Sequence, residues 1–242
     1  REIHRSLDFW NASYFCGSAA VLRRKLLDEV GGIAGQTITE DAETSFQLHS
    51  RGYNSLYYGR PMVCGLSPEN YSDYFVQRSR WAQGMIQLLI FNNPLFTRGL
   101  SFAQRLCYFN FSFYWFFGLA RIMFLLAPIL VLMFHVRIYF ATPQQVLTYV
   151  LPYIATTVLV MNFFYRRARR PFFSEVYECV QSAVLALAAL SVLFNPRKPT
   201  FKVTPKEMVV REQSLKPVGL VFVVLIVLSF LTVVMSIRTG YL

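Results

Sequence analysis

The stretch RLCYFNFSFYWFFGLARIMFLLAP, Arg105–Pro128, decides the fold class because a long apolar run begins within it, directly after ordinary soluble sequence. Residues 1–105 contain 11 Lys/Arg and 9 Asp/Glu, whereas residues 106–242 contain 13 Lys/Arg and only 4 Asp/Glu. Hydrophobic residues make up 55% of the 242-residue chain. This composition is too apolar for a soluble domain and is typical of a membrane protein.

Four apolar segments follow, and each is long enough for a span of roughly 20 residues. The third lies between two basic stretches, YRRARRP at 165–171 and NPRKPTFK at 195–202, and basic loops face the cytosol. A segment whose two ends both lie in the cytosol cannot be a single membrane crossing, so it is predicted to be an interfacial helix. The predicted spans are residues 109–136, 145–165 and 217–237, and the predicted interfacial helix is 175–194. The net charge of +11 then marks cytosolic loops near anionic lipid rather than a nucleic-acid site.

Residues 1–105 have the pattern of part of a mixed α/β, cytosolic domain. Small and apolar residues predict a buried strand in 12–24, and a β-rich stretch with Pro61 predicts an edge strand in 53–66. The predicted helices are a short one ended by Gly31 and Gly32, one from Thr39 to about Ser50, and a long amphipathic one from Glu69 to about Phe91. The chain begins at Arg1 in charged sequence, so it is expected to be a fragment of a longer protein.

The acidic stretch ITEDAETSFQLHSRGY, Ile38–Tyr53, admits two interpretations. Thr39 followed by acids in the first turn is typical of an ordinary helix cap that is favourable against the helix dipole. Alternatively, Asp41 or Glu40 acts as a general base that deprotonates a sugar hydroxyl. A helix N-terminus keeps such a carboxylate ionised. The three-residue motif TED, Thr39–Asp41, does not by itself separate the two interpretations.

A second motif is QRSRW, Gln77–Trp81, in which Gln77, Arg80 and Trp81 share one helix face. The face is either an interface tryptophan with a snorkelling arginine, or a sugar platform beside an anion clamp. In the first membrane segment, Arg121 follows a run of aromatic residues. It is either a snorkelling arginine beside an aromatic belt, or a buried donor facing a polar cavity. The four cysteines have no CxxC spacing and the three histidines do not cluster with them, so no zinc site or disulfide framework is indicated.

The order TED, QxxRW and then membrane segments resembles the processive family-2 glycosyltransferases, which are synthases of cellulose, chitin, hyaluronan and similar β-linked polymers. FWNASYFCGSAAVLRR, Phe9–Arg24, resembles the FFCGS stretch of cellulose synthases, with Tyr14 in place of the first Phe. FKVTPK, Phe201–Lys206, matches the FxVTxK gating loop of bacterial cellulose synthase catalytic subunits. The resemblance covers nearly the whole chain.

This resemblance implies the C-terminal part of an α/β GT-A-type glycosyltransferase domain at 1–105, then a membrane-embedded α-helical channel at 106–242 with a gating loop at 199–215. The fold is expected to be mainly α overall. The implied activity is an inverting, processive transfer of glucose from UDP-glucose to a growing β-1,4-glucan, which is translocated across the bacterial inner membrane. Alternatives are a synthase of another β-linked polysaccharide, or a non-catalytic membrane scaffold or export pore.

The resemblance also implies residue roles. Asp41 is the expected general base. The acceptor site is expected to comprise Cys16, Gly17, Ser18, Glu40 and Trp81. The nucleotide and pyrophosphate are expected to contact Gln77, Arg80, Phe201, Val203, Thr204 and Lys206, and the channel is expected to be lined by Trp115, Phe116 and Arg121.

The Mg²⁺ ligands and the cyclic di-GMP-binding domain of the parent enzyme are expected outside this chain, which holds no metal-binding motif and is expected to be inactive alone. The expected partners are UDP-glucose, the glucan, the lipid bilayer and a periplasmic accessory subunit, with no nucleic acid.

Overall fold

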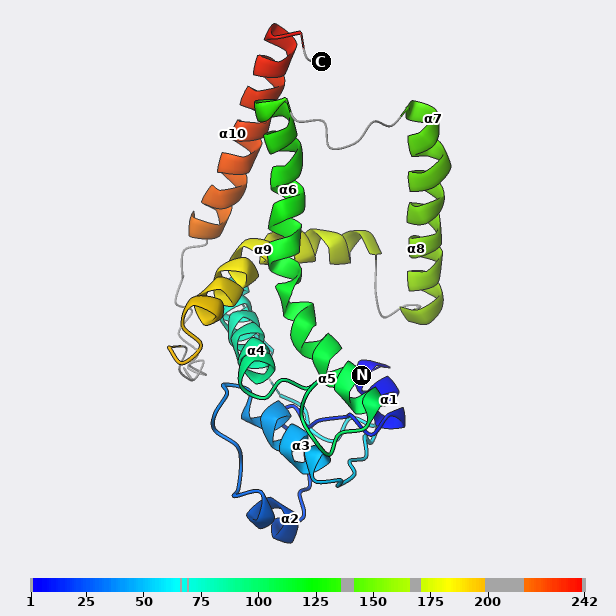
Figure 1. Cartoon of the computed structure of the whole chain (residues 1–242), viewed down its shortest axis with the longest axis vertical. Coiled ribbons are helices and arrows are strands. Elements are labelled where there is room, and N and C mark those ends of the chain that lie inside the picture. The colour runs from blue at the N-terminus through cyan, green and yellow to red at the C-terminus, as the bar shows by residue number, and fades with distance from the viewer. Residues whose placement is uncertain are drawn as a thin grey trace. The chain divides into compact units, whose positions relative to one another are not determined.

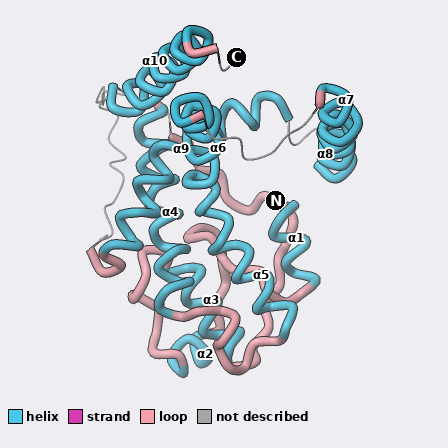
Figure 2. The backbone as a smooth tube through the Cα atoms, turned by 45° about the horizontal axis from the view of Figure 1, so that its top comes forward, coloured by secondary structure: helices cyan, strands magenta, loops and turns pink. Residues whose placement is uncertain are grey.

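The computed structural model describes residues 2–65, 67–68, 70–135, 142–165, 171–198 and 216–240. These residues are mainly helical (Figures 1 and 2). The chain divides into two compact units, one formed by Arg1–Phe117 with Val184–Ser214 and the other by Gly118–Ala183 with Leu215–Leu242. We describe each unit by itself.

The first unit is built around three helices that share an apolar core. They are α3 (Glu40–Ser50), α4 (Tyr71–Phe91) and α5 (Phe102–Phe113). Phe46 of α3 is 2% exposed, and its ring meets the ring of Tyr108 of α5 edge to face, with 5.0 Å between the centroids. Ile86 and Leu88 are fully buried. The other helices of this unit are α1 (Glu2–Phe9), α2 (Arg24–Glu29), the 3-10 turn η1 (Tyr114–Phe116) and the second half of α9 (Pro171–Phe194).

The helices predicted in this unit are confirmed, and local chemistry explains their ends. Gly31 and Gly32 follow α2 with φ of 91° and 97°, and Gly52 follows α3 with φ of 83°. These left-handed conformations suit glycine because it lacks a Cβ. At the start of α4, the Asn70 side chain accepts a hydrogen bond from the Asp73 N–H at 2.8 Å.

The two predicted strands are wrong, since no strand occurs among the described residues. Residues 53–59 are not in a strand, and two of their amides bond to side chains. The N–H of Ser55 donates to Asn11 Oδ1 at 2.9 Å, and the N–H of Tyr57 donates to Asp8 Oδ1 at 2.6 Å. In residues 12–24, the N–H of Phe15 donates to Ser45 Oγ at 3.4 Å. The α/β character predicted for 1–105 is therefore not confirmed.

The second unit consists of long apolar helices. They are α6 (Phe117–Phe134), α7 (Pro143–Gln145), the π-helical turn η2 (Val146–Val150), α8 (Leu151–Tyr165), the first half of α9, and α10 (Lys216–Arg238). Helices α6 and α10 run side by side, and His135 Nε2 lies 3.1 Å from Thr239 Oγ1 at their ends. Figure 1 shows the first half of α9 crossing α6 rather than running along it.

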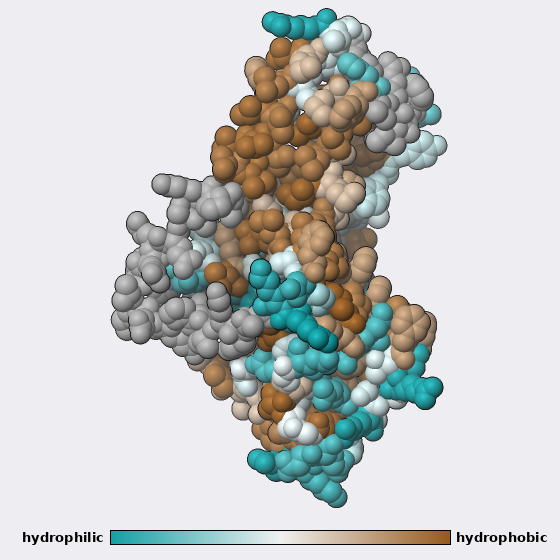
Figure 3. All heavy atoms as spheres, turned by 60° about the vertical axis from the view of Figure 1, so that its left-hand side comes forward, coloured by the Kyte–Doolittle hydropathy of each residue, from teal (hydrophilic) through white to brown (hydrophobic). Residues whose placement is uncertain are grey.

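Four helical stretches are long and apolar enough to cross a membrane, judged over the described residues. They are Phe102–Phe134, Pro143–Tyr165, Phe173–Phe194 and Gly219–Arg238. All four predicted apolar segments are thus helical. The first starts earlier than predicted and is interrupted by η1. Figure 3 shows apolar side chains covering a large continuous part of the surface, consistent with the exposed Leu220, Ile226 and Phe230 of α10.

Candidate active site

The acidic motif lies at the start of α3, where the helix places Asp41 in its first turn. Asp41 Oδ1 accepts a hydrogen bond from the N–H of Ala42 at 2.8 Å. Burial raises the pKa of the Asp41 carboxyl above its usual value, and the charge of Glu40 raises it further. The Ala42 N–H and the Arg80 guanidinium act in the opposite direction and favour the ionised form. Asp41 is thus a partly desolvated carboxyl whose raised pKa makes it a stronger proton acceptor, with the Ala42 N–H and the Arg80 guanidinium as groups that favour its ionised form.

Thr39 precedes α3 as predicted, but its hydroxyl caps no helix N–H. It points instead toward Met85 Sδ on α4, at 3.9 Å. The acids of this turn also differ in their surroundings. Glu43 is fully buried, and its carboxylate accepts a hydrogen bond from the Thr37 N–H at 2.8 Å. Glu43 therefore fixes the loop before the helix, while Asp41 is left beside the Cys16–Ser18 loop.

The loop Cys16–Ser18 faces Asp41, as the prediction of a shared site requires. A Cβ placed on Gly17 would lie 3.5 Å from Asp41 Oδ2, and Gly17 has a φ of 62°. Cys16 Sγ lies 3.1 Å from His4 Nε2. The residue as a whole is exposed, but desolvation of the sulfur, followed by the charge of Asp41, raises the pKa of the Cys16 thiol to about 11. Cys16 is therefore a neutral thiol beside a carboxylate, suited to line a site rather than to attack.

Tyr14 and His4 lie beside Cys16, and the sequence interpretation assigned them no role. Burial, together with the charges of Cys16 and Asp41, raises the pKa of the Tyr14 hydroxyl far above its usual value. Burial lowers the pKa of His4, whose ring meets that of Tyr14 edge to face at 4.8 Å. The Cys16 loop is therefore flanked by hydrogen-bonding groups that stay uncharged at neutral pH.

Helix α4 lies directly against the loop that precedes α3 and contains Ile38 and Thr39, here called the TED loop. A Cβ added to Gly84 would stand 2.6 Å from Thr39 Cγ2 and 2.7 Å from the Thr39 backbone nitrogen, so only glycine fits. One helical turn further on, Gln87 is 2% exposed and its Oε1 accepts a hydrogen bond from the Ile38 N–H at 3.0 Å. The two motifs, 36 residues apart between Asp41 and Gln77, are thereby fixed to one another.

The QxxRW motif lies on the exposed half of α4. Gln77 and Arg80 are half-buried, and Trp81 is 38% exposed. The Arg80 guanidinium lies within electrostatic reach of Asp41, since its charge lowers the pKa of that carboxyl. Asp41 therefore lies beside Gly17 and within electrostatic reach of Arg80, and Trp81 follows Arg80 directly on α4.

Arg78, inside the motif, was missed by the sequence interpretation. Its guanidinium carbon lies 5.5 Å from the ring centroid of Trp81, 5.9 Å from that of Trp115 and 5.3 Å from that of Tyr74. Trp115, predicted to line a channel, is only 8% exposed here. Arg78 thus joins the tryptophan of the motif to that of η1, through cation–π contacts. Only the repeated basic character of QRSRW could have suggested such a role.

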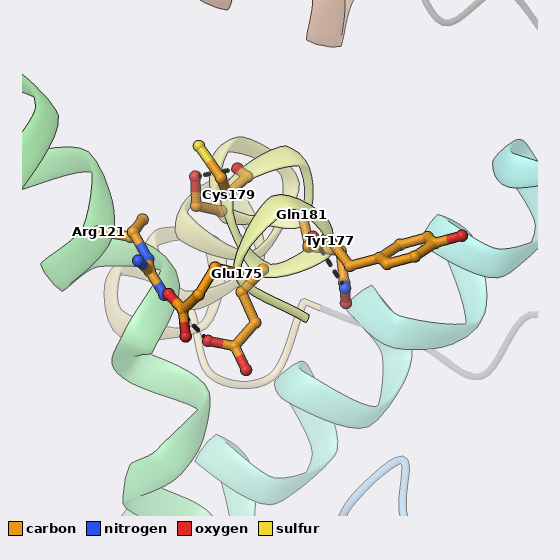
Figure 4. A network of polar contacts seen from close by, with 7 residues as sticks. Arg121, Glu175, Tyr177, Cys179 and Gln181 are labelled. Carbon is orange, nitrogen blue, oxygen red and sulfur yellow. Dashed lines mark hydrogen bonds and ion pairs between the residues drawn. The ribbon is translucent and has the colours of Figure 1, made fainter. Parts of the chain in front are cut away.

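Arg121 belongs to the second unit and is ion-paired rather than isolated in the apolar helix. Its Nη2 lies 2.8 Å from Glu175 Oε2 and 3.0 Å from Glu178 Oε2, both on α9 (Figure 4). Two acids near the start of α9 thus compensate the charge of Arg121. Its predicted role in the channel stays a prediction, as does that of the half-buried Phe116.

Some predicted site residues are not assembled here. Phe201, Val203, Thr204 and Lys206 of the predicted gating loop lie outside the described residues. Glu40 is half-buried beside Asp41, and Ser18 is exposed next to Gly17. Over the described ranges, no group of three His, Cys, Asp or Glu side chains could hold a metal ion.

A family model described as Glycosyl transferase family group 2 matches residues 6–235. The chain therefore belongs to the family-2 glycosyltransferases. It is 41% identical over 206 residues to the cellulose synthase catalytic subunit [UDP-forming] of Pseudomonas fluorescens (strain SBW25), covering 85% of this chain and 28% of that relative. It is 37% identical over 207 residues to the cellulose synthase 1 catalytic subunit [UDP-forming] of Komagataeibacter xylinus, covering 86% of this chain and 28% of the relative. The chain thus spans less than a third of the length of these relatives.

Proposed function

We propose that this chain is the acceptor-side part of a UDP-glucose-dependent, UDP-forming cellulose synthase, an inverting and processive glycosyltransferase. The observation that carries the proposal is the position of Asp41. Its carboxylate lies in the first turn of α3, beside the Gly17 loop and near Arg80 of the QxxRW helix. The similarity to cellulose synthase catalytic subunits supports glucose and cellulose as the substrate and product classes.

In the proposed reaction, the 4-hydroxyl of the terminal glucose lies against Asp41. The carboxylate takes the hydroxyl proton while the oxygen attacks the anomeric carbon of UDP-glucose. The bond from that carbon to the diphosphate oxygen breaks, and UDP departs with the bonding electron pair. Attack opposite to the leaving group inverts the anomeric centre from α to β. General-base assistance of this kind contributes about 10²–10⁴ in rate.

Other residues would orient the acceptor and balance charge. Trp81 offers an exposed aromatic face on which a pyranose ring can stack. Arg80 offers a cation near the reaction centre for the diphosphate, and Gln77 shares its helix face. Cys16, Gly17 and Ser18 would line the acceptor pocket together with Glu40.

The remaining parts of the activity belong to the whole protein. We place the Mg²⁺ ligands and the cyclic di-GMP-binding domain in the larger portion of the relatives' length that this chain does not span. Mg²⁺, when bound there, would neutralise the diphosphate. The gating residues Phe201, Val203, Thr204 and Lys206 would close over the nucleotide. Trp115, Phe116 and Arg121 would lie along the path of the glucan, which would pass the bacterial inner membrane toward a periplasmic accessory subunit.

For the membrane arrangement, we propose three crossings, by the α5–α6 stretch, α8 and α10, with α9 at the cytosolic interface. In support, α9 carries Glu175 and Glu178 and buries Gln181 and Ser182. Its first half crosses α6 in Figure 1. Single cysteines near Arg169 and Lys198 in the full-length protein should both react with a cytosolic thiol reagent. Labelling from opposite sides would overturn this topology.

The function is tested by the product. Membranes that contain the full-length protein should incorporate glucose from UDP-glucose into a polymer whose linkages are β-1,4 and which a cellulase digests. A polymer of another sugar or linkage would favour a different β-glycan synthase. No polymer under any donor or activator would favour a scaffold or pore.

A further inference from the structure

A single buried amide, that of Gln87, connects the catalytic loop to the end of another helix. Its Oε1 accepts from the Ile38 N–H at 3.0 Å, three residues before Asp41. Its Nε2 donates to the Pro196 carbonyl at 2.7 Å, two residues after α9 ends. Gln87 is 2% exposed, and its bond to the Ile38 N–H is buried while its bond to Pro196 is partly buried. All three segments belong to the same compact unit.

The side chain at this position must be both donor and acceptor. An amide offers a carbonyl and an NH₂ on one planar group, so each half meets its backbone partner only in one orientation. An apolar side chain would leave the buried Ile38 N–H unpaired, at a cost of about 1–3 kcal/mol, and would remove the donor to the Pro196 carbonyl. An ionised carboxylate would satisfy the Ile38 N–H but repel the Pro196 carbonyl.

We propose that Gln87 is a positioning residue, which sets the register of the TED loop against the end of α9 and so places Asp41. The inference rests on the proposed function in that Asp41 is taken as the base. Gly84 lets α4 approach the loop, and Gln87 then fixes the loop along the helix. Gln87 touches no substrate, so its effect on the reaction passes through the backbone of Ile38 and Thr39.

The first test uses Gln87→Met in the full-length enzyme, which keeps the volume and removes both bonds. The turnover number kcat should fall on the order of 10-fold or more, because small displacements of a reacting group are costly. The KM for UDP-glucose should change little. Gln83→Ala is the matched control. Gln83 Nε2 donates to Ser191 Oγ at 3.0 Å between the same two helices, in a more exposed position. This control should keep a kcat close to wild type.

The second test separates positioning from general stability. In Gln87→Glu, the protonated acid can donate to Pro196 and accept from Ile38, whereas the carboxylate cannot donate. Its kcat relative to wild type should therefore rise as pH is lowered, while that of Gln87→Met stays constant with pH. Wild-type kcat in Gln87→Met, or identical pH trends in the two variants, would overturn the proposal.

The same assay distinguishes failure of the proposal from failure of the proposed function. If Asp41→Asn keeps wild-type activity, Asp41 is not the base and the proposed function fails. If Asp41→Asn is inactive and Gln87→Met is fully active, only the positioning role fails. A melting temperature of the purified protein, measured for each variant, shows that the enzymes compared are folded.

Discussion

Gly84→Ala should separate the two motifs of the site. The added Cβ would stand 2.6 Å from Thr39 Cγ2 and 2.7 Å from the Thr39 nitrogen, where ordinary contacts begin at 3.4 Å. The backbone nitrogen cannot rotate away, so α4 and the TED loop must move apart by roughly 0.7 Å, the difference between these distances. Overpacking of this kind costs about 1–3 kcal/mol of stability. The melting temperature should fall accordingly.

The displacement should also affect catalysis, because Thr39 lies two residues before Asp41. A shift of about 1 Å can cost on the order of 100-fold in rate, so roughly 10-fold is expected here. The assay is the initial rate of glucose incorporation from UDP-glucose by the full-length enzyme. Gly35→Ala is the control, since an added Cβ at Gly35 meets no atom within 4 Å. Wild-type rate and melting temperature in Gly84→Ala would refute the close approach of α4 to the loop.

Three further predictions concern stability and coupling. Burial lowers the pKa of His49 to about 4, so the unfolded state binds the proton more tightly. The contribution of His49 to stability should be constant above about pH 6.5 and fall by about 1.4 kcal/mol per pH unit between about pH 6.5 and pH 4. His49→Gln should remove this slope in melting temperatures, and an unchanged slope would contradict the assignment. Arg78→Ala should lower the free energy of unfolding by about 0.5–2 kcal/mol, because the contacts of Arg78 with aromatic rings are lost. It should impair use of the acceptor more than it changes the KM for UDP-glucose, and the reverse pattern would exclude a role of Arg78 in holding Trp81. Arg121→Met should lower the melting temperature more than the triple variant that also replaces Glu175 and Glu178 with Gln, because the single change removes the Arg121 guanidinium from both carboxylates; equal losses would show that the ion pairs are irrelevant.

The sequence was sufficient for features with a local cause. Helix α3 ends before Gly52, as the conformational preference of glycine predicts, and it starts after Thr39 as predicted, although the Thr39 hydroxyl makes no capping hydrogen bond. The apolar segments were found because length and hydropathy suffice to identify them. The interruption of the first segment at η1 has no comparable signal, since Tyr114–Phe116 continues the same aromatic run.

Features that depend on distant partners were missed. Residues 53–59 have strand propensity, but Asn11 and Asp8 take the amides that a neighbouring strand would have bonded. In the site, Asp41 was found from its motif, whereas Gln87 was missed because its partners, Ile38 and Pro196, are 49 and 109 residues away. Side-chain periodicity shows that a residue is buried, but it does not identify the backbone groups that the residue will meet.

The central claim is that Asp41 takes the proton of the acceptor hydroxyl. The most direct measurement compares polymer synthesis and UDP binding by the full-length enzyme and by its Asp41→Asn variant. Asparagine keeps the shape of the side chain and removes the base. Synthesis should fall by about 10²–10⁴, while the Kd for UDP stays close to wild type. Near-normal synthesis by Asp41→Asn would contradict the claim and return the TED motif to the role of an ordinary helix start.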